Sequence, residues 1–118
     1  MRDIAPDITR QRLLVEGFYD VDLDDARVEE YLQGVAANLG LRTYGRPAIF
    51  APAGEGQAQN QGFDAFLPLI DSGISLYVWT GPRFLAVVLF TCTAFDEVEA
   101  VAYTRRFFAL GAHEAQGF

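Results

Sequence analysis

The chain has 118 residues, enough for one domain with a single hydrophobic core. Hydrophobic residues make up 51% and charged residues 21% of it, a balance that is typical of globular proteins and excludes a disordered chain. The net charge of −7 argues against a surface for nucleic acid or anionic membrane lipid, because such surfaces need clustered Lys and Arg.

Three further features bear on where the protein works. Cys92 is the only cysteine, so no disulfide can form within the chain. Residues Met1–Arg12 alternate in charge and lack the apolar stretch of a signal peptide. The longest apolar run, Phe84–Phe90, is too short to cross a bilayer as a helix. We therefore expect a cytoplasmic protein that does not associate with membranes.

The first half of the chain predicts a strand, a helix and a second strand. The first strand is expected over Leu13–Tyr19, after which Asp20-Val21-Asp22 leads into the helix. Its apolar residues recur every three or four positions and share one face: Val28, Tyr31, Leu32, Val35 and Leu39. Gly40 is expected to end this helix in the left-handed conformation. The second strand is expected over Thr43–Phe50, where Pro47 favours a sheet edge.

The middle of the chain predicts a loop and three strands. The polar segment Pro52–Gln61, rich in Gly and Gln, is expected to be an exposed, mobile loop. The three strands are expected at Phe63–Ile70, Ile74–Thr80 and Phe84–Thr91. The connectors Asp71-Ser72-Gly73 and Gly81-Pro82-Arg83 are short enough to make both junctions hairpins.

The last part predicts a second helix that completes the fold. Asp96 is expected to cap its start, Arg105-Arg106 lie near its end, and Gly111 is expected to terminate it. The order β-α-β-β-β-β-α predicts an α+β two-layer sandwich, with an antiparallel sheet covered by helices on one face. Because the strand Phe84–Thr91 is apolar on both faces, we expect the uncovered face to pack against a second copy, giving a homodimer.

A group of residues resembles a known family. Gln61–Ser72 reads QGFDAFLPLIDS and is followed by Trp79 and then by Phe90-Thr91-Cys92. In the prokaryotic S-adenosylmethionine decarboxylase family, a strand with Gly-x-Ser runs into a Glu-Ser-His turn. A His-Thr-Trp-Pro-Glu segment follows, and then a strand that ends in Phe-Thr-Cys. The likeness extends over about residues 12–110, so the chain resembles a divergent member of this pyruvoyl-dependent family.

The resemblance implies a role for three residues. Ser72 falls at the pyruvoyl-forming serine, Trp79 at the family tryptophan and Cys92 at the catalytic cysteine. In the family, the serine hydroxyl attacks the preceding carbonyl, and elimination of the resulting ester leaves an N-terminal pyruvoyl group. That group forms a Schiff base with the substrate amine and acts as the electron sink for decarboxylation, a step of polyamine biosynthesis.

Several groups that this chemistry needs are replaced. The family histidine five residues after the serine is Tyr77 here, and the upstream serine is Asp64. A phenol is a weaker proton acceptor than an imidazole at neutral pH. The histidine next to the cleavage serine is Gly73, and the only histidine of the chain is His113. We therefore predict a chain that stays intact, with no cofactor unless Ser72 is processed to a pyruvoyl group.

The residues at the turn have both a structural and a functional interpretation. Ser72 suits any tight hairpin, which we favour over a retained nucleophile. Cys92 is either a small buried side chain, which we favour, or the proton donor of the family. Asp71 keeps the acidic character of the family glutamate and is a candidate ligand-binding residue, although acidic residues are common in turns.

Aromatic and acidic residues are further candidates for ligand binding. Trp79 either stacks on an adenine ring or fills the core, and Tyr77 is expected on the same strand face. Phe50, in a segment similar to the family Phe-x-Pro-x-Gly, would be a second stacking partner. A polyamine or other cation is a candidate ligand of an acidic stretch, although we favour the simpler interpretation that this stretch is a solvated helix face. The stretch consists of Asp20, Asp22, Asp24, Asp25, Glu29 and Glu30.

Three functions follow from these patterns. The first is a relative of the decarboxylase that is not processed and binds S-adenosylmethionine or a similar ligand as a regulatory protein. The second is an enzyme with altered chemistry that uses Cys92, Tyr77 or Asp64 on a small amine or sulfonium substrate. The third is an active decarboxylase that is processed by an unusual route. No pattern typical of a metal site, P-loop or dinucleotide site is present.

Overall fold

The computed structural model of the chain describes residues 1–51 and 61–118. Its elements, in chain order, are β1 (Gln11–Phe18), α1 (Asp25–Asn38), β2 (Ala48–Phe50), β3 (Gly62–Leu69), β4 (Ser72–Trp79), β5 (Phe84–Thr91), α2 (Glu97–Phe108) and β6 (His113–Gly117). The loop expected over residues 52–61 lies, except for Gln61, outside the described residues.

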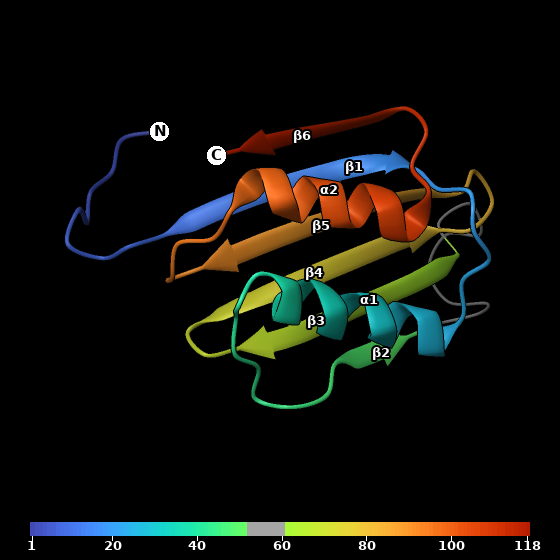
Figure 1. The fold of residues 1–118 in the computed structure, drawn as a ribbon, viewed down its shortest axis with the longest axis horizontal. Coiled ribbons are helices and arrows are strands. Elements are labelled where there is room, and N and C mark those ends of the chain that lie inside the picture. The colour runs from blue at the N-terminus through green and yellow to red at the C-terminus, as the bar shows by residue number, and fades with distance from the viewer. Residues whose placement is uncertain (52–60) are drawn as a thin grey trace.

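The strands form one sheet in the order β2-β3-β4-β5-β1-β6, and every neighbouring pair is antiparallel. Both helices lie on the same face of this sheet, α2 across β1 and β5 and α1 across β3 and β4 (Figure 1). This arrangement confirms the predicted α+β fold and the element order β-α-β-β-β-β-α. The face away from the helices is called the open face below.

Some element ends differ from the sequence-based expectations. The C-terminal strand β6 was not expected, because all five of its residues are exposed and carry no alternating apolar pattern. The second strand is shorter than expected: Thr43 makes only an isolated bridge with Leu69. The prediction that Gly111 ends the second helix is wrong, since Ala109 caps α2 in the left-handed conformation with φ 49°.

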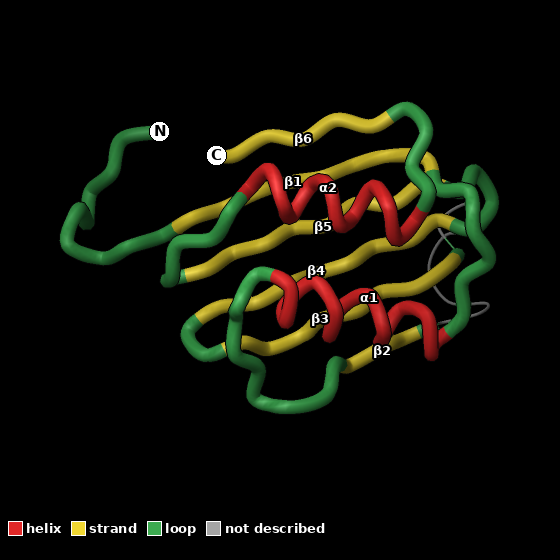
Figure 2. The backbone as a smooth tube through the Cα atoms, in the orientation of Figure 1, coloured by secondary structure: helices red, strands yellow, loops and turns green. Residues whose placement is uncertain are grey.

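Capping residues explain where the two helices begin and where the first ends. The Asp24 side chain accepts a hydrogen bond from the Arg27 N–H at 2.8 Å, and Asp96 accepts one from the Glu99 N–H at 3.1 Å. Gly40 follows α1 with φ 69°, as predicted, a backbone conformation that favours glycine. The chain therefore turns sharply after α1 and runs back along the end of the sheet (Figure 2).

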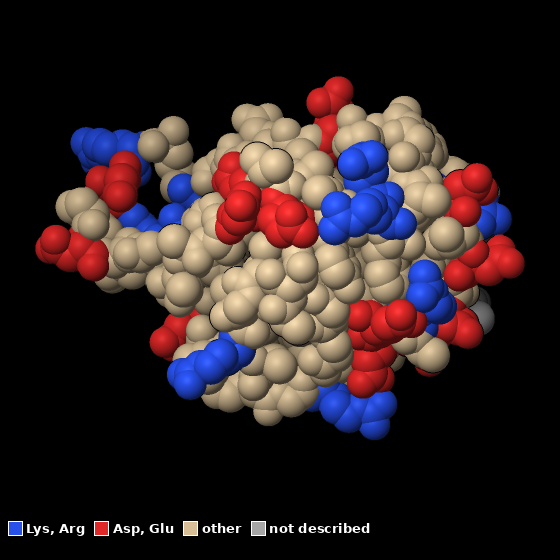
Figure 3. Space-filling model, viewed as in Figure 1, with Lys and Arg blue, Asp and Glu red and all other residues tan. Residues whose placement is uncertain are grey.

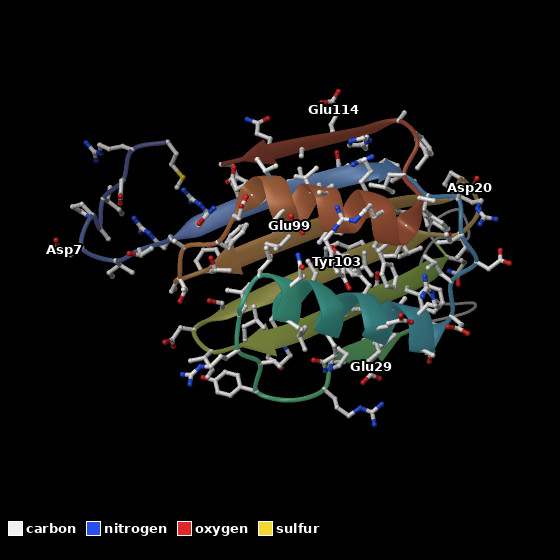
Figure 4. All side chains as sticks on the ribbon, viewed as in Figure 1. Asp7, Asp20, Glu29, Glu99, Tyr103 and Glu114 are labelled. Carbon is white, nitrogen blue, oxygen red and sulfur yellow. The ribbon has the colours of Figure 1, made fainter. Side chains whose placement is uncertain are left out.

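The hydrophobic core lies between the helices and the sheet. Alternate residues of the central strands point into it, and α1 contributes Val28, Tyr31, Leu32, Val35 and Ala36. Gly34 allows the helices to approach, because a Cβ at this position would lie 2.0 Å from the Tyr103 hydroxyl. Tyr103 extends from α2 into the space between the helices (Figure 4).

One buried polar contact joins the two helices. The Thr104 hydroxyl donates to the Ala100 carbonyl at 2.8 Å, so the Tyr31 hydroxyl, 2.7 Å from Thr104 Oγ1, must be the donor of that bond. Burial raises the pKa of the Tyr31 hydroxyl, which keeps it protonated as a donor.

We expect Thr104→Val to destabilise the fold more than Tyr31→Phe. The first change leaves the buried Tyr31 hydroxyl without an acceptor, at a cost of about 1–3 kcal/mol, whereas the second removes that hydroxyl and costs about 1 kcal/mol. The double variant should lose less unfolding free energy than the sum of the single variants. Urea unfolding monitored by circular dichroism measures these differences, and equal or reversed single effects would contradict them.

Candidate functional site

The β3–β4 hairpin turns at Ile70-Asp71, because Leu69 is already paired with Ser72. The expected connector Asp71-Ser72-Gly73 is thus replaced by a shorter turn, and both Ser72 and Gly73 belong to β4. Asp71 has φ 57°, a left-handed conformation that aspartate tolerates better than most residues. The Ile70 N–H donates to the Arg42 carbonyl at 3.1 Å, so the segment that follows α1 lies against this turn.

Ser72 and Cys92, twenty residues apart in the sequence, meet at the end of the sheet. Pairing of Gly73 with Phe90 places the start of β4 beside the end of β5. The Cys92 N–H donates to Ser72 Oγ at 2.9 Å, and both residues are half-buried. The fold therefore brings together two of the residues that the sequence singled out.

A hollow of about 260 Å³ opens at this point and is called the turn hollow below. Its walls are residues 40–42, 69–72 and 92–93. The residues that line it include Ser72 and Cys92, one basic residue, Arg42, and one acidic residue, Asp71. Arg42 was not predicted from the sequence, because only the packing of the segment after α1 against the hairpin brings it here.

Four other candidates lie on the open face. Phe50 is paired with Asp64, and Asp64 with Tyr77, so these three residues form a row across β2, β3 and β4. Trp79 lies two residues after Tyr77 on β4 and shares its face, as predicted. Leu76 and Val78, which alternate with these two residues, are buried under the helices on the opposite face. Phe50 is 63% and Tyr77 40% exposed.

The candidates thus fall into two separate groups. Tyr77 is five strand residues from Ser72, which corresponds to about 16 Å, and Asp64 is equally far because it pairs with Tyr77. Side chains of Ser72 and Tyr77 also leave β4 on opposite faces, since their positions differ by an odd number. Within one chain, neither Tyr77 nor Asp64 can reach the bond between Asp71 and Ser72.

His113 is equally remote from Ser72. His113 pairs with Gly17 of β1. Gly17 in turn pairs with Leu85 of β5, and Leu85 pairs with Val78 of β4. This row crosses β4 six residues from Ser72, so the imidazole is about 20 Å away along the strands and about 14 Å across them. Its Nδ1 lies 2.8 Å from the Gly111 carbonyl oxygen.

Two glycines of the β3–β4 pair show close packing. A Cβ at Gly62 would lie 1.8 Å from the Val78 carbonyl oxygen, a clash with backbone that no side chain rotation can relieve. A Cβ at Gly73 would lie 2.5 Å from the Phe66 ring, so any larger residue requires that ring to move. Gly62 is therefore needed for the pairing itself.

The acidic stretch around the start of α1 is largely engaged in ion pairs and caps. Glu29 pairs with Arg46 at 2.8 Å, and the hydrogen bond from Arg46 lowers the pKa of the Glu29 carboxyl. Glu30 pairs with Arg27 at 3.0 Å, and Asp24 caps the helix. Figure 3 shows clusters of acidic and basic groups next to each other around a broad uncharged area of the face seen there. A polyamine site at this stretch stays a prediction.

The described residues contain neither a membrane-spanning helix nor a metal-binding cluster. Neither α1 nor α2 is long and apolar enough to cross a membrane, and no other helix is found in residues 1–51 and 61–118. The same ranges hold no group of three or more His, Cys, Asp or Glu side chains that could bind a metal ion.

Comparison with known proteins supports the fold. No protein-family model matches the sequence, and no curated protein matches it. Among solved structures, the adenosylmethionine decarboxylase from Aquifex aeolicus VF5 is similar, with a TM-score of 0.70. The two chains are 19% identical, and the alignment covers 94% of this chain and 89% of that one. At this identity the likeness establishes a common fold.

We expect Ser72→Ala to lower the free energy of unfolding by about 1 kcal/mol, because the half-buried Cys92 N–H loses its acceptor. Ser75→Ala is the matched control: Ser75 lies on the same strand, and its side chain makes no hydrogen bond within the described residues. Its effect should stay within about 0.5 kcal/mol. Chemical unfolding measures both, and equal effects would show that the Ser72 contact does not stabilise the turn.

Proposed function

We propose that this chain is a cytoplasmic, unprocessed relative of the S-adenosylmethionine decarboxylases that binds S-adenosylmethionine or a similar ligand as a homodimer. The shared fold and the contact between Ser72 and Cys92 support the relation. The observation that carries the proposal is the distance of every imidazole from Ser72: the one histidine of the chain, His113, lies far along the sheet.

The chemistry of self-cleavage explains why this distance matters. Attack by Ser72 Oγ on the Asp71 carbonyl needs a polar group that stabilises the oxyanion, and the upstream serine of the family is Asp64 here, far along the sheet. Elimination of the ester needs a base that takes the proton from the Ser72 Cα, and loss of a general base costs on the order of 10²–10⁴ in rate. The titratable residues that line the turn hollow are Arg42, Asp71 and Cys92, and none of them carries an imidazole. Without an imidazole, the chain should remain whole.

The open face supports the homodimer. Large apolar side chains that alternate with the core residues are exposed on it: Phe18, Phe50, Phe66, Tyr77 and Phe90. A second copy packed face to face would remove this surface from water. Dimerisation would not supply the missing imidazole. His113 pairs with Gly17 on the helix-covered side of the sheet, away from the open face, and it lies on the edge strand β6.

Mass spectrometry of the purified, denatured protein tests the first part of the proposal. We expect one species at 13.1 kDa, because no imidazole lies near Ser72 to take the proton from its Cα. Pieces of 71 and 47 residues, the second blocked by a pyruvoyl group, would overturn the proposal. Ser72→Ala is the control, since fragments that persist in this variant arise from a protease.

The homodimer is tested by light scattering coupled to size-exclusion chromatography. We expect the wild type to be dimeric, and Phe90→Asp, which places a charge on the open face of β5, to weaken the dimer at least about tenfold. Val98→Asp is the matched control, because Val98 is 80% exposed on α2, on the other side of the molecule. A monomeric wild type, or dimeric Phe90→Asp, would contradict the open-face dimer.

A further inference from the structure

We infer that the groove between helix α2 and edge strand β6 is a docking site for an extended peptide segment of another protein. The peptide adds to β6 as a seventh strand and carries a basic, an apolar and an acidic residue at every second position. This surface is separate from the open face and from the turn hollow. The inference therefore goes beyond the proposed function and does not depend on it.

The outer edge of β6 carries backbone groups that no other strand pairs with. β6 is the last strand of the sheet formed by residues 1–51 and 61–118 (Figure 1). The Phe118 N–H donates to the Arg12 carbonyl at one end of its pairing with β1, and the Phe18 N–H donates to the Ala112 carbonyl at the other. Hydrogen bonding alternates along an antiparallel strand, so the odd-numbered residues of β6 direct their N–H and C=O groups outward. An extended chain offers donors and acceptors at the same spacing.

A mainly apolar hollow of about 430 Å³ lies between α2 and β6 and is called the α2–β6 groove below. It is lined by Val98 and Val101 of α2 and by the small residues Ala115 and Gly117 of β6. Ala115 pairs with the core residue Val15, so its side chain lies on the helix-covered side of the sheet. A strand added beside β6 would therefore place every second side chain over the groove.

Two charged residues flank the apolar part of the α2–β6 groove. Glu97 lies at the start of α2, and a Cβ at Gly117 would be 2.7 Å from Glu97 Oε1, so this carboxylate lies against the Gly117 backbone. Arg105 lines the groove two helical turns further along, about 12 Å away. Neither Glu97 nor Arg105 forms an ion pair with any of the residues that the structure describes.

The distance between these two charges matches the repeat of a strand. Residues i, i+2 and i+4 of an extended chain share one face and span about 13 Å. In a peptide antiparallel to β6, a basic residue opposite Gly117 would lie beside Glu97. An acidic residue opposite His113 would lie towards Arg105, and the apolar residue between them would lie opposite Ala115, over the groove. Charge complementarity thus defines which peptide fits.

Fluorescence anisotropy with the full chain and the labelled peptide Thr-Lys-Thr-Val-Thr-Glu-Thr tests the backbone part of the inference. We expect saturable binding below about 1 mM, as for weak transient complexes. N-methylation of the Lys, Val and Glu of the peptide should weaken binding at least about tenfold, because their N–H groups face β6 and would be lost as donors. N-methylation of the two inner Thr is the matched control, because their N–H groups face away from β6, and it should leave the affinity unchanged.

Variants of the protein test the position of the site, with circular dichroism to confirm folding. Ala102→Asp places a charge in the α2–β6 groove and should weaken binding at least about tenfold, whereas Ala26→Asp, on the exposed side of α1, should not. Arg105→Glu should weaken binding at least about threefold and should prefer a peptide in which Lys replaces Glu. Arg106→Glu is the matched control, because Arg106 is the next residue, pairs with Glu99 and does not line the groove.

Three outcomes would overturn the inference. The first is an absence of binding at about 1 mM peptide, and the second is equal binding of the two N-methylated peptides or unchanged binding by Ala102→Asp. The third is occupation of the edge by a second copy: light scattering would then show assemblies larger than the open-face dimer, which Ala115→Pro disperses by removing an outward N–H. None of these outcomes changes the expected intact mass, so the proposed function is tested separately.

Discussion

Antiparallel pairing of β4 with β5 sets Gly73 opposite Phe90, and the contact between Ser72 and Cys92 depends on this register. It places the Cys92 N–H 2.9 Å from Ser72 Oγ. The same register, combined with the alternation of side chains along a strand, sends Tyr77 to the open face and keeps Leu76 in the core. A shift of one residue would exchange these faces and separate Ser72 from Cys92, so the hydrophobic core and the candidate site are specified together.

The two groups of candidates have different physical settings. The turn hollow is formed where hydrogen bonds join three chain segments: the Ile70 N–H donates to the Arg42 carbonyl, and the Cys92 N–H donates to Ser72 Oγ. The row of Phe50, Asp64 and Tyr77 lies on an exposed sheet surface instead. A ligand bound only at the hollow would be recognised mainly through charge, whereas contacts with the row depend on what covers the open face.

The sequence predicted the fold more fully than the site, for identifiable reasons. The helix face of Val28, Tyr31 and Val35 follows a local periodic pattern and the strand Phe84–Thr91 is a local apolar run, and the structure bears out both elements. Strand β6 carries no such pattern, because pairing with β1 depends on backbone groups rather than on apolar side chains. Ser72 and Cys92 were each singled out by the family resemblance, but Arg42 joins them only through tertiary packing, which no local pattern records.

Gly62 has a consequence for how related sequences are interpreted. Its hydrogen atom faces the Val78 carbonyl oxygen at a place where a methyl group cannot fit, so this position is restricted by strand pairing whatever chemistry the chain performs. In the segment Gly62-Phe63-Asp64 the glycine is kept, while a carboxylate stands where the resembling family has a hydroxyl. A glycine at this position therefore indicates the strand pairing of this fold. It does not by itself indicate decarboxylase activity in a sequence that carries it.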